Sequence, residues 1–307
     1  MRLVIATRGS ELALWQANHV KARLEAIGCA IELNVIKTTG DKILDRPLAE
    51  VGGKGLFVKE IEQALLDGTA DLAVHSMKDV PADLAPGLTM AAVSEREDVR
   101  DALVSRGGVS FDDLPAGARV GTSSLRRICQ LRALRGDLEF VPLRGNVPTR
   151  VDKVMAGEVD AAVLAAAGLI RLGRGEQISE LFDPARVLPA GGQGALGIET
   201  RTADPAIATM VRRAIHHEGD AACVAAERGL LARLEGGCQT PLAAWARLID
   251  ADTGTLQLHA LVGRPDGTEI IRAERVGSVS DPAALGSAVG TELLSRGADH
   301  ILRALSD

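Results

Sequence analysis

The chain has 307 residues, a length typical of two or three domains. Its hydrophobic residues (46%) and charged residues (25%) are in the proportions of a globular protein, and its net charge is −6. Aromatic residues are few, with four Phe, two Trp and no Tyr, so aliphatic side chains must fill the core. An acidic chain with so few rings for bases to stack on is a poor candidate for binding nucleic acid.

The first residues, MRLVIATRGSELALWQ, do not resemble a signal peptide, because Arg8 and Glu11 interrupt a short apolar run. No apolar window is long enough to span a membrane. The cysteines are widely spaced and form no C-x-x-C pair: Cys29, Cys129, Cys223 and Cys238. We therefore expect a cytoplasmic protein with reduced cysteines and no metal site.

Short apolar runs alternate with helical patterns over the first two thirds, which is typical of an α/β protein. Strands are expected at 3–6, 31–36 and 70–75. A helix is expected from Leu12 to Ile27, and a second one places Ile61, Ala64 and Leu65 on the same face as Phe57. The Gly-rich loop between them, 38–55, is either a mobile surface loop or a lid over a cleft.

The pattern then repeats. ARVGTSS at 118–124 is similar to VIATRGS at 4–10, and the segment 155–168 is similar to 66–79. We therefore predict two similar α/β units, at about 1–95 and 100–190.

The last 90 residues follow another pattern. A helix at 218–234 precedes the turn that holds Cys238, and three strands are expected in AAWARLID, TLQLHALVG and TEIIRAERV. A final helix is expected at 281–305. These elements predict a small α+β domain.

Arginine is concentrated between Arg119 and Arg150, where seven Arg and no Lys accompany two acidic residues. This stretch is either a solvated surface or a source of bidentate contacts to carboxylates or phosphates. Three segments here and in the first unit join Ser, Thr or Asn to a predicted helix start: ATRGS (6–10), GTSSLRR (121–127) and LRGNVPTR (143–150). In the last of them, Asn146 is the expected cap and Pro148 lies in the first turn. Together they predict a ligand with several negative groups, bound between domains.

Three further residues each allow a structural and a functional interpretation. Asp79, at the end of a strand in HSMKDVP, is either a turn cap or a carboxylate in a ligand site, where it would suit a substrate that develops positive charge. Gln193, in the Gly-rich run PAGGQGALGIE, lies at a crossover and is a candidate polar contact. Cys238 follows Gly236 and Gly237, so its thiol is either incidental or an attachment point.

Eight segments in this order resemble the porphobilinogen deaminase (hydroxymethylbilane synthase) family over nearly the whole chain. They are ATRGSELALWQ, VGGKGLFVKE, DLAVHSMKDVP, GTSSLRR, LRGNVPTR, AAAGLIRLG, PAGGQGALGIE and EGGCQTP. The resemblance implies two lobes like those of type II periplasmic binding proteins and a small C-terminal α+β domain with a three-stranded sheet. The implied domains are 1–95 with 195–212, 100–190, and 217–307.

The resemblance also implies an activity. Four porphobilinogen molecules would be joined head to tail with loss of ammonia, to give linear hydroxymethylbilane for tetrapyrrole and haem biosynthesis. A dipyrromethane cofactor, linked to Cys238 by a thioether, would be the primer. Asp79 matches the catalytic carboxylate; it would stabilise an azafulvenium cation and could move protons. The enzyme would be a cytoplasmic monomer that binds neither nucleic acid nor membrane.

The remaining site residues follow from motif position. Those implied beside Cys238 at the cofactor are Arg126, Arg127, Lys78, Ser124 and Thr122. Those implied at the substrate carboxylates are Arg8, Ser10, Gln16, Arg144, Arg150, Arg171 and Thr149. Those in or beside the lid are Lys54, Phe57 and Lys59. Glu11 and Gly191 depart from the family pattern; we expect Glu11 to point to solvent.

Two other functions are compatible with parts of the sequence. A non-catalytic protein of the same two-lobed shape could capture a small anion, in which case Cys238 would be unmodified. A nucleic-acid protein could use the Arg-rich stretch, against the negative charge and the scarcity of aromatics; salt-sensitive oligonucleotide binding would reveal it.

Overall fold

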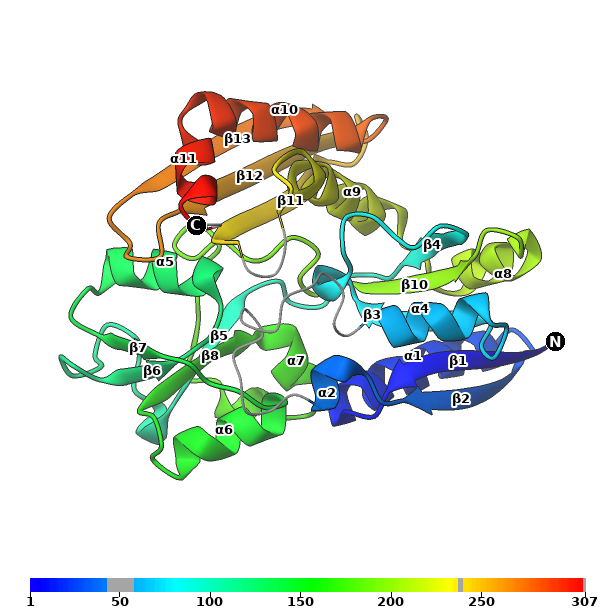
Figure 1. Ribbon diagram of the computed structural model, residues 1–307, viewed down its shortest axis with the longest axis horizontal. Helices are drawn as coiled ribbons and strands as arrows, with labels where there is room; N and C mark the ends of the chain where they lie inside the picture. The colour runs from blue at the N-terminus through cyan, green and yellow to red at the C-terminus, as the bar shows by residue number, and fades with distance from the viewer. Residues whose placement is uncertain (43–57, 237–239, 306–307) are drawn as a thin grey trace. The chain divides into compact units, whose positions relative to one another are not determined.

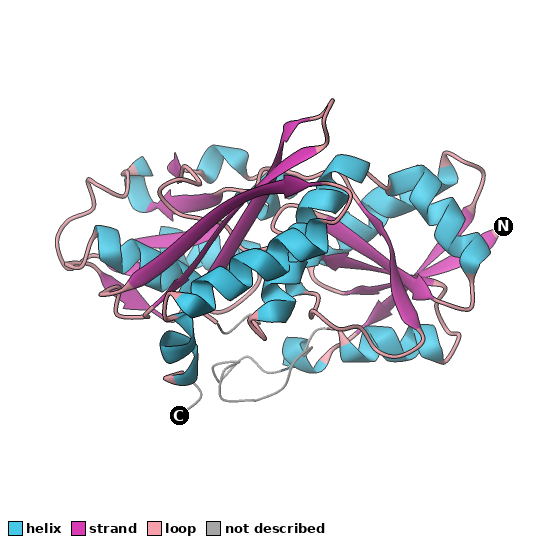
Figure 2. Cartoon of the chain, turned by 90° about the horizontal axis from the view of Figure 1, so that it is seen from above, coloured by secondary structure: helices cyan, strands magenta, loops and turns pink. Residues whose placement is uncertain are grey.

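The computed structural model describes residues 1–42, 58–236 and 240–305, which fall into two compact units (Figure 1). The first comprises Met1–Glu97 with Ala195–Ala221, and the second Asp98–Gly194 with Ala222–Asp307. Within the units, strands form the centre and helices flank them (Figure 2). In the described part of the chain, no helix is long and apolar enough to cross a membrane.

The first unit is built on a five-stranded mixed sheet in the order β2-β1-β3-β10-β4. Its strands are β1 (Arg2–Arg8), β2 (Ala30–Ile36), β3 (Leu72–Ser76), β4 (Leu88–Val93) and β10 (Leu196–Arg201). β1 runs parallel to both β2 and β3, whereas β10 runs antiparallel to β3 and β4. The chain thus returns after residue 195 to insert a strand into the sheet that it began.

Helices cover this sheet because their apolar residues fall on one side. They are α1 (Glu11–Glu25), α4 (Lys59–Leu66) and α8 (Pro205–Ile215). The unit also contains the short helices α2 (Thr39–Lys42) and η1 (Met77–Asp79, a 3-10 helix). The hydroxyl of Ser10 caps α1 by accepting a hydrogen bond from the Ala13 amide, 3.3 Å away. α1 and α8 pack on one face of the sheet, and α4 contributes buried Ile61 and Leu65 to a cluster on the other.

The second unit contains a sheet of the same design, in the order β7-β6-β8-β5-β9. Its strands are β5 (Asp101–Ser105), β6 (Arg119–Gly121), β7 (Glu139–Val141), β8 (Ala161–Ala165) and β9 (Glu180–Leu181). Here β6 is parallel to β7 and β8, and β5 is the antiparallel strand. The accompanying helices are α5 (Leu125–Leu134), α6 (Val147–Met155), α7 (Ala166–Arg171), η2 (Arg106–Gly108) and η3 (Gly175–Gln177).

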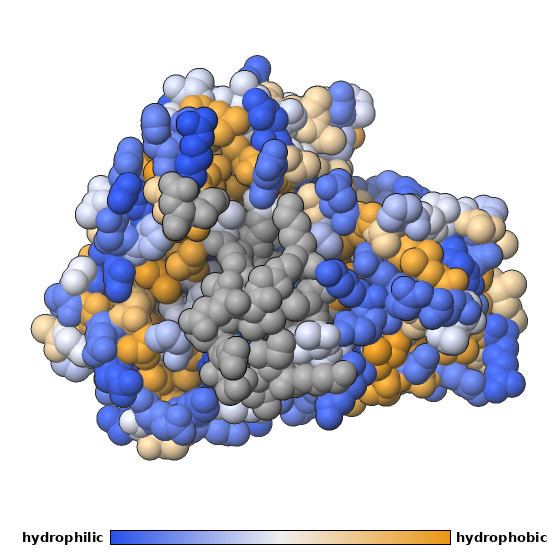
Figure 3. Space-filling model, viewed as in Figure 1, coloured by the Kyte–Doolittle hydropathy of each residue, from blue (hydrophilic) through white to orange (hydrophobic). Residues whose placement is uncertain are grey.

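The C-terminal part of the second unit is an antiparallel sheet of β11 (Leu242–Asp250), β12 (Thr255–Gly263) and β13 (Ile270–Ser278). Its core includes residues from three helices: α9 (Glu218–Arg233), α10 (Pro282–Ser295) and α11 (Ala298–Arg303). The sheet also contacts α5, since buried Cys129 packs with Ala243 and Leu261. Hydrophilic side chains cover much of the face in Figure 3, with apolar ones between them.

The structure confirms the predicted fold class, with two α/β lobes and a small three-stranded α+β domain. The prediction of one final helix at 281–305 is wrong. Gly297 adopts a left-handed conformation (φ 100°) between α10 and α11, which ends the first helix and starts the second. Glu11 is exposed, as expected. The exact domain boundaries given above stay a prediction.

Candidate functional site

A small pocket in the first unit gathers three of the predicted site residues, Arg8, Gln16 and Asp79. Arg8 ends β1, and Asp79 lies in η1 directly after β3, so both follow parallel neighbouring strands at the same edge of the sheet. Gln16 is buried on α1 and donates from Nε2 to Ser76 Oγ, 2.8 Å away. The pocket therefore combines a carboxylate, a guanidinium group and an ordered amide.

The other predicted residues of this unit lie close by in the sequence. Lys78 precedes Asp79 in η1 and is partly buried. The hydroxyl of Ser10 accepts the capping bond of α1, which leaves its own proton as a donor. Lys59 is the exposed first residue of α4. Lys54 and Phe57 lie outside the described residues.

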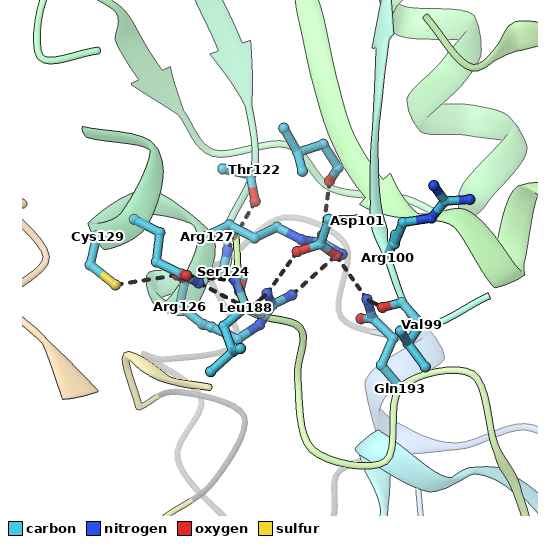
Figure 4. A network of polar contacts seen from close by, with 12 residues as sticks. Val99, Arg100, Asp101, Thr122, Ser124, Arg126, Arg127, Cys129, Leu188 and Gln193 are labelled. Carbon is cyan, nitrogen blue, oxygen red and sulfur yellow. Dashed lines mark hydrogen bonds and ion pairs between the residues drawn. The ribbon is translucent and has the colours of Figure 1, made fainter. Parts of the chain in front are cut away.

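In the second unit, Arg126 and Arg127 converge on one buried carboxylate, Asp101 (Figure 4). The two arginines are 5% and 6% exposed and Asp101 is fully buried. Arg126 Nη1 donates to Asp101 Oδ2 (2.7 Å), and Arg127 Nη2 donates to Oδ1 (2.8 Å). Gln193 Nε2 adds a third donor to Oδ1, at 2.9 Å. Two cations thus share one anion, and the cluster keeps a formal charge of about +1.

The electrostatics of this cluster follow from burial and pairing. Burial by itself would raise the pKa of Asp101, but the guanidinium groups of Arg126 and Arg127 outweigh it and hold that pKa well below its usual range. Burial lowers the pKa of Arg127, and Asp101 opposes that shift. Because arginine ionises so far above neutral pH, all three groups stay charged.

One donor of this cluster has no partner within the described residues. Arg127 Nη1 donates to the Val163 carbonyl and Nη2 to Asp101, but the buried Nε has no acceptor. A buried guanidinium N–H without an acceptor is costly, so its position favours an incoming anion. Thr122 and Ser124, between β6 and α5, lie near Arg127 in Figure 4, and Thr122 Oγ1 accepts from the Ser124 amide at 3.3 Å.

The remaining predicted residues of the second unit lie on α6, α7 and the loop before α6. Asn146 caps α6 as expected, since its Oδ1 accepts from the Thr149 amide (2.9 Å) and hydroxyl (2.7 Å). Arg150 Nε donates to the Gly145 carbonyl at 2.8 Å, and Arg171 Nη2 donates to the Gly194 carbonyl at 2.6 Å. Arg144 is partly buried in the loop.

Sequence reasoning missed Asp101, the residue that organises the arginine pair. An acid that begins the apolar run DALV was the available indication, because a charge in a buried strand needs a partner. Cys238 lies outside the described residues. Among those that are described, no group of three His, Cys, Asp or Glu could hold a metal ion.

Family models account for most of the chain. Residues 3–209 match "Porphobilinogen deaminase, dipyromethane cofactor binding domain", and residues 221–295 match "Porphobilinogen deaminase, C-terminal domain". The chain belongs to the porphobilinogen deaminase family. A porphobilinogen deaminase of Syntrophobacter fumaroxidans is 54% identical over 300 residues, which is 97% of this chain and 96% of that protein.

Solved structures with a similar arrangement include periplasmic binding proteins. A nutrient-binding protein of Burkholderia cenocepacia bound to methionine has 14% identity and a TM-score of 0.43; the match covers 69% of this chain and 90% of that one. A binding protein of Salmonella typhimurium with high arginine specificity has 14% identity and a TM-score of 0.40, over 69% and 91% of the two chains.

The residues present fit a cofactor that carries carboxylates. The cluster of Arg126, Arg127 and Asp101 has excess positive charge, and the donor at Arg127 Nε has no acceptor among the described residues. Both arginines and Asp101 lie inside the range matched by the family model of the cofactor-binding domain. An acidic pyrrole substituent would supply the missing acceptor. The predicted roles of the individual residues remain proposals.

Proposed function

We propose that this member of the porphobilinogen deaminase family condenses four porphobilinogen molecules head to tail, with loss of ammonia, and releases linear hydroxymethylbilane for tetrapyrrole, and hence haem, biosynthesis. The 54% identity over nearly the whole chain supports this activity. The observation that carries the proposal is the pocket in which Asp79 lies with Arg8 and Gln16 at the carboxyl ends of β1 and β3.

Asp79 is proposed as the catalytic carboxylate. When ammonia leaves porphobilinogen, the pyrrole becomes a cation, and a fixed negative charge beside it lowers the energy of that state. Arg8 in the same pocket suits an acetate or propionate of the substrate, because a guanidinium group binds a carboxylate through two parallel hydrogen bonds. Ser10 and Gln16 are proposed as polar partners of this substrate.

The arginines of the second unit are proposed as the sites for further carboxylates. Each pyrrole brings two, so a chain of several pyrroles needs several fixed cations. Arg126 and Arg127, with Lys78, Ser124 and Thr122, are assigned to the cofactor, which supplies a covalently held primer when bound. The assigned substrate binders of this unit are Arg144, Arg150, Arg171 and Thr149.

Cys238 is proposed as the residue that holds the cofactor through a thioether. The two preceding glycines, Gly236 and Gly237, have no side chain to obstruct the approach of a bulky group. Lys54, Phe57 and Lys59 are proposed to belong to a lid. By resemblance to the family, we further propose a cytoplasmic monomer; light scattering during size-exclusion chromatography tests the oligomeric state.

Formation of hydroxymethylbilane from porphobilinogen by the purified protein tests the proposed activity, and replacement of Asp79 tests the catalytic role proposed for it. Asp79→Asn keeps the shape of the side chain and removes its charge, so we expect turnover of porphobilinogen to fall by at least about a hundredfold. Asp83→Asn is the matched control, because Asp83 is exposed and does not line the pocket. Near-normal hydroxymethylbilane formation by Asp79→Asn would remove Asp79 from this role.

A further inference from the structure

A buried pair of ionisable residues, His75 and Glu199, lies at the pocket of Asp79. His75 on β3 is 6% exposed and lines this pocket, and Glu199 on β10 is fully buried. Their side chains meet at 3.0 Å, between His75 Nε2 and Glu199 Oε2. The antiparallel register pairs Glu199 with Ala73, so Glu199 and His75 are diagonal neighbours on one face of the sheet.

That face is the one covered by α4, since Ala73 packs there with Ile61 and Leu65. The surroundings of His75 therefore include charged groups from four elements. Glu199 comes from β10 and Glu62 from α4, and Arg8 from β1 and Asp79 from η1 line the pocket itself. Burial raises the pKa of the Glu62 carboxyl, and the nearby Glu199 adds to the rise.

The pair is incompletely satisfied. Glu199 Oε2 contacts His75, but the buried Oε1 has no hydrogen-bond partner among the described residues. A buried carboxylate with one empty oxygen costs stability, and a purely structural pair gains nothing from it. Such a cost is typical of a polar group retained for function.

A carboxylate on one ring nitrogen of histidine has a defined effect. It fixes the orientation of the ring, keeps the proton on that nitrogen and leaves the other nitrogen to exchange protons. It also compensates the charge of the imidazolium. Glu199 thus holds His75 at Nε2, and Nδ1 is the ring nitrogen that this carboxylate does not contact.

We propose that His75 carries a proton in the deamination pocket and that Glu199 is the positioning residue that orients it and compensates its charge. The proposal rests on the proposed function. When the aminomethyl C–N bond of porphobilinogen breaks, its electron pair leaves on nitrogen and the imidazolium protonates the departing amine. When the attacking pyrrole carbon forms the new C–C bond, it loses one proton, and the neutral imidazole takes it up. His75 ends each addition as it began, and Asp79 stabilises the cation between the two transfers.

Two variants and a control test the roles proposed for His75 and Glu199. His75→Gln keeps a hydrogen-bonding side chain that cannot carry a proton, and we expect kcat to fall about a hundredfold with KM changed by less than about threefold. Glu199→Gln removes the compensating anion, so kcat should fall about tenfold and the alkaline limb of its pH profile should move to lower pH. Glu218→Gln is the control: it alters another His–Glu pair of the same unit, with His216 at 3.3 Å, which does not line the pocket.

Nuclear magnetic resonance of the histidine ring nitrogens gives a readout apart from turnover. The His75 signals, assigned by their loss in His75→Gln, should report a proton on Nε2 in the parent and a changed state in Glu199→Gln. If Glu199→Gln is too unstable to purify, Glu199→Asp takes its place, because its shorter side chain moves the carboxylate away from the ring. The alkaline limb of its kcat–pH profile should also move to lower pH, by less than expected for Glu199→Gln.

The inference is overturned if His75→Gln retains kcat within about threefold of the parent, or if Glu199→Gln lowers kcat without moving the pH limb or the ring signals. Either result leaves the proposed function standing, provided the parent makes hydroxymethylbilane. Failure of the parent to make it would overturn the proposed function, and this inference with it.

Discussion

Removal of the Asp101 charge should destabilise the second unit strongly. Asp101 accepts hydrogen bonds from Arg126, Arg127 and Gln193 while fully buried. In Asp101→Asn, an amide N–H₂ replaces one of the accepting oxygens and two buried cations lose their anion. Breaking a buried pair by removing one partner costs about 3–5 kcal/mol, a large share of the 5–15 kcal/mol that a typical protein has.

Tryptophan fluorescence can follow this unit by itself. The chain has two tryptophans, Trp15 on α1 of the first unit and Trp245 on β11 of the second. In a Trp15→Phe background, urea unfolding monitored by Trp245 emission reports the free energy of unfolding of the second unit. Asp98→Asn is the matched control, because the ion pair of Asp98 with Arg100 (2.6 Å) is partly exposed to solvent and its loss should cost less than that of the fully buried Asp101 cluster.

The contribution of Asp101 to the free energy of unfolding should also depend on pH in a defined direction. The pKa of Asp101 is depressed in the folded state, so its contribution is complete above the unfolded value of about 3.9 and is lost as pH falls below it. The difference in free energy of unfolding between the parent and Asp101→Asn should therefore be constant from pH 7 to about 5 and become smaller in stronger acid. A loss at pH 7 no larger than that of Asp98→Asn would refute the reasoning.

Three further changes have expected outcomes. Arg127→Leu should lower the fraction of chains that carry the cofactor, measured by intact mass, and an unchanged fraction would contradict the role given to its Nε donor. Gly286→Ala should destabilise the protein by about 1–3 kcal/mol or more, because a Cβ there would lie 2.0 Å from the Ala226 carbonyl of α9. A Cβ in Gly290→Ala would meet side-chain atoms instead of backbone, with Arg233 Cγ at 2.8 Å and Arg233 Cβ at 3.0 Å, so this variant should cost less. Equal melting temperatures of the two variants would contradict this. Burial raises the pKa of the Cys129 thiol to about 11, so about one thiol in a thousand is ionised at pH 8 and alkylation of Cys129 in the folded protein should be very slow. The neutral thiol also favours the folded state, and this contribution to the free energy of unfolding, complete below about pH 9, should be lost as the pH rises towards 11. Rapid labelling of Cys129 in the folded protein at pH 8 would contradict the raised pKa of this thiol.

Local patterns were sufficient to predict much of the fold. The strands at 3–6, 31–36 and 255–263 and the cap at Asn146 follow from apolar periodicity and helix-start residues, which act over a few positions. The antiparallel strands β5 and β10 were not predicted from such patterns, because their place in a sheet depends on contacts far away in the sequence. The break at Gly297 was missed because a single glycine inside a helical pattern is often tolerated.

The candidate site also combines residues that local sequence patterns indicate with residues that only contacts distant in sequence bring together. Arg8 and Asp79, which line one pocket, could be proposed from the sequence because each lies at the end of an apolar strand in a recognisable segment. The partners Asp101 and Glu199 could not, because 25 residues separate Asp101 from Arg126 and 124 separate His75 from Glu199. Only the sheet register brings such groups together, and no local signature marks them.

The central claim is that Cys238 holds a dipyrromethane primer for the condensation of porphobilinogen. The intact mass of the purified, denatured protein, followed by peptide mapping, tests it most directly. The account predicts an excess of two linked pyrrole units on the peptide that contains Cys238, either as purified or after incubation with porphobilinogen. A Cys238 peptide that stays unmodified after that incubation would contradict it.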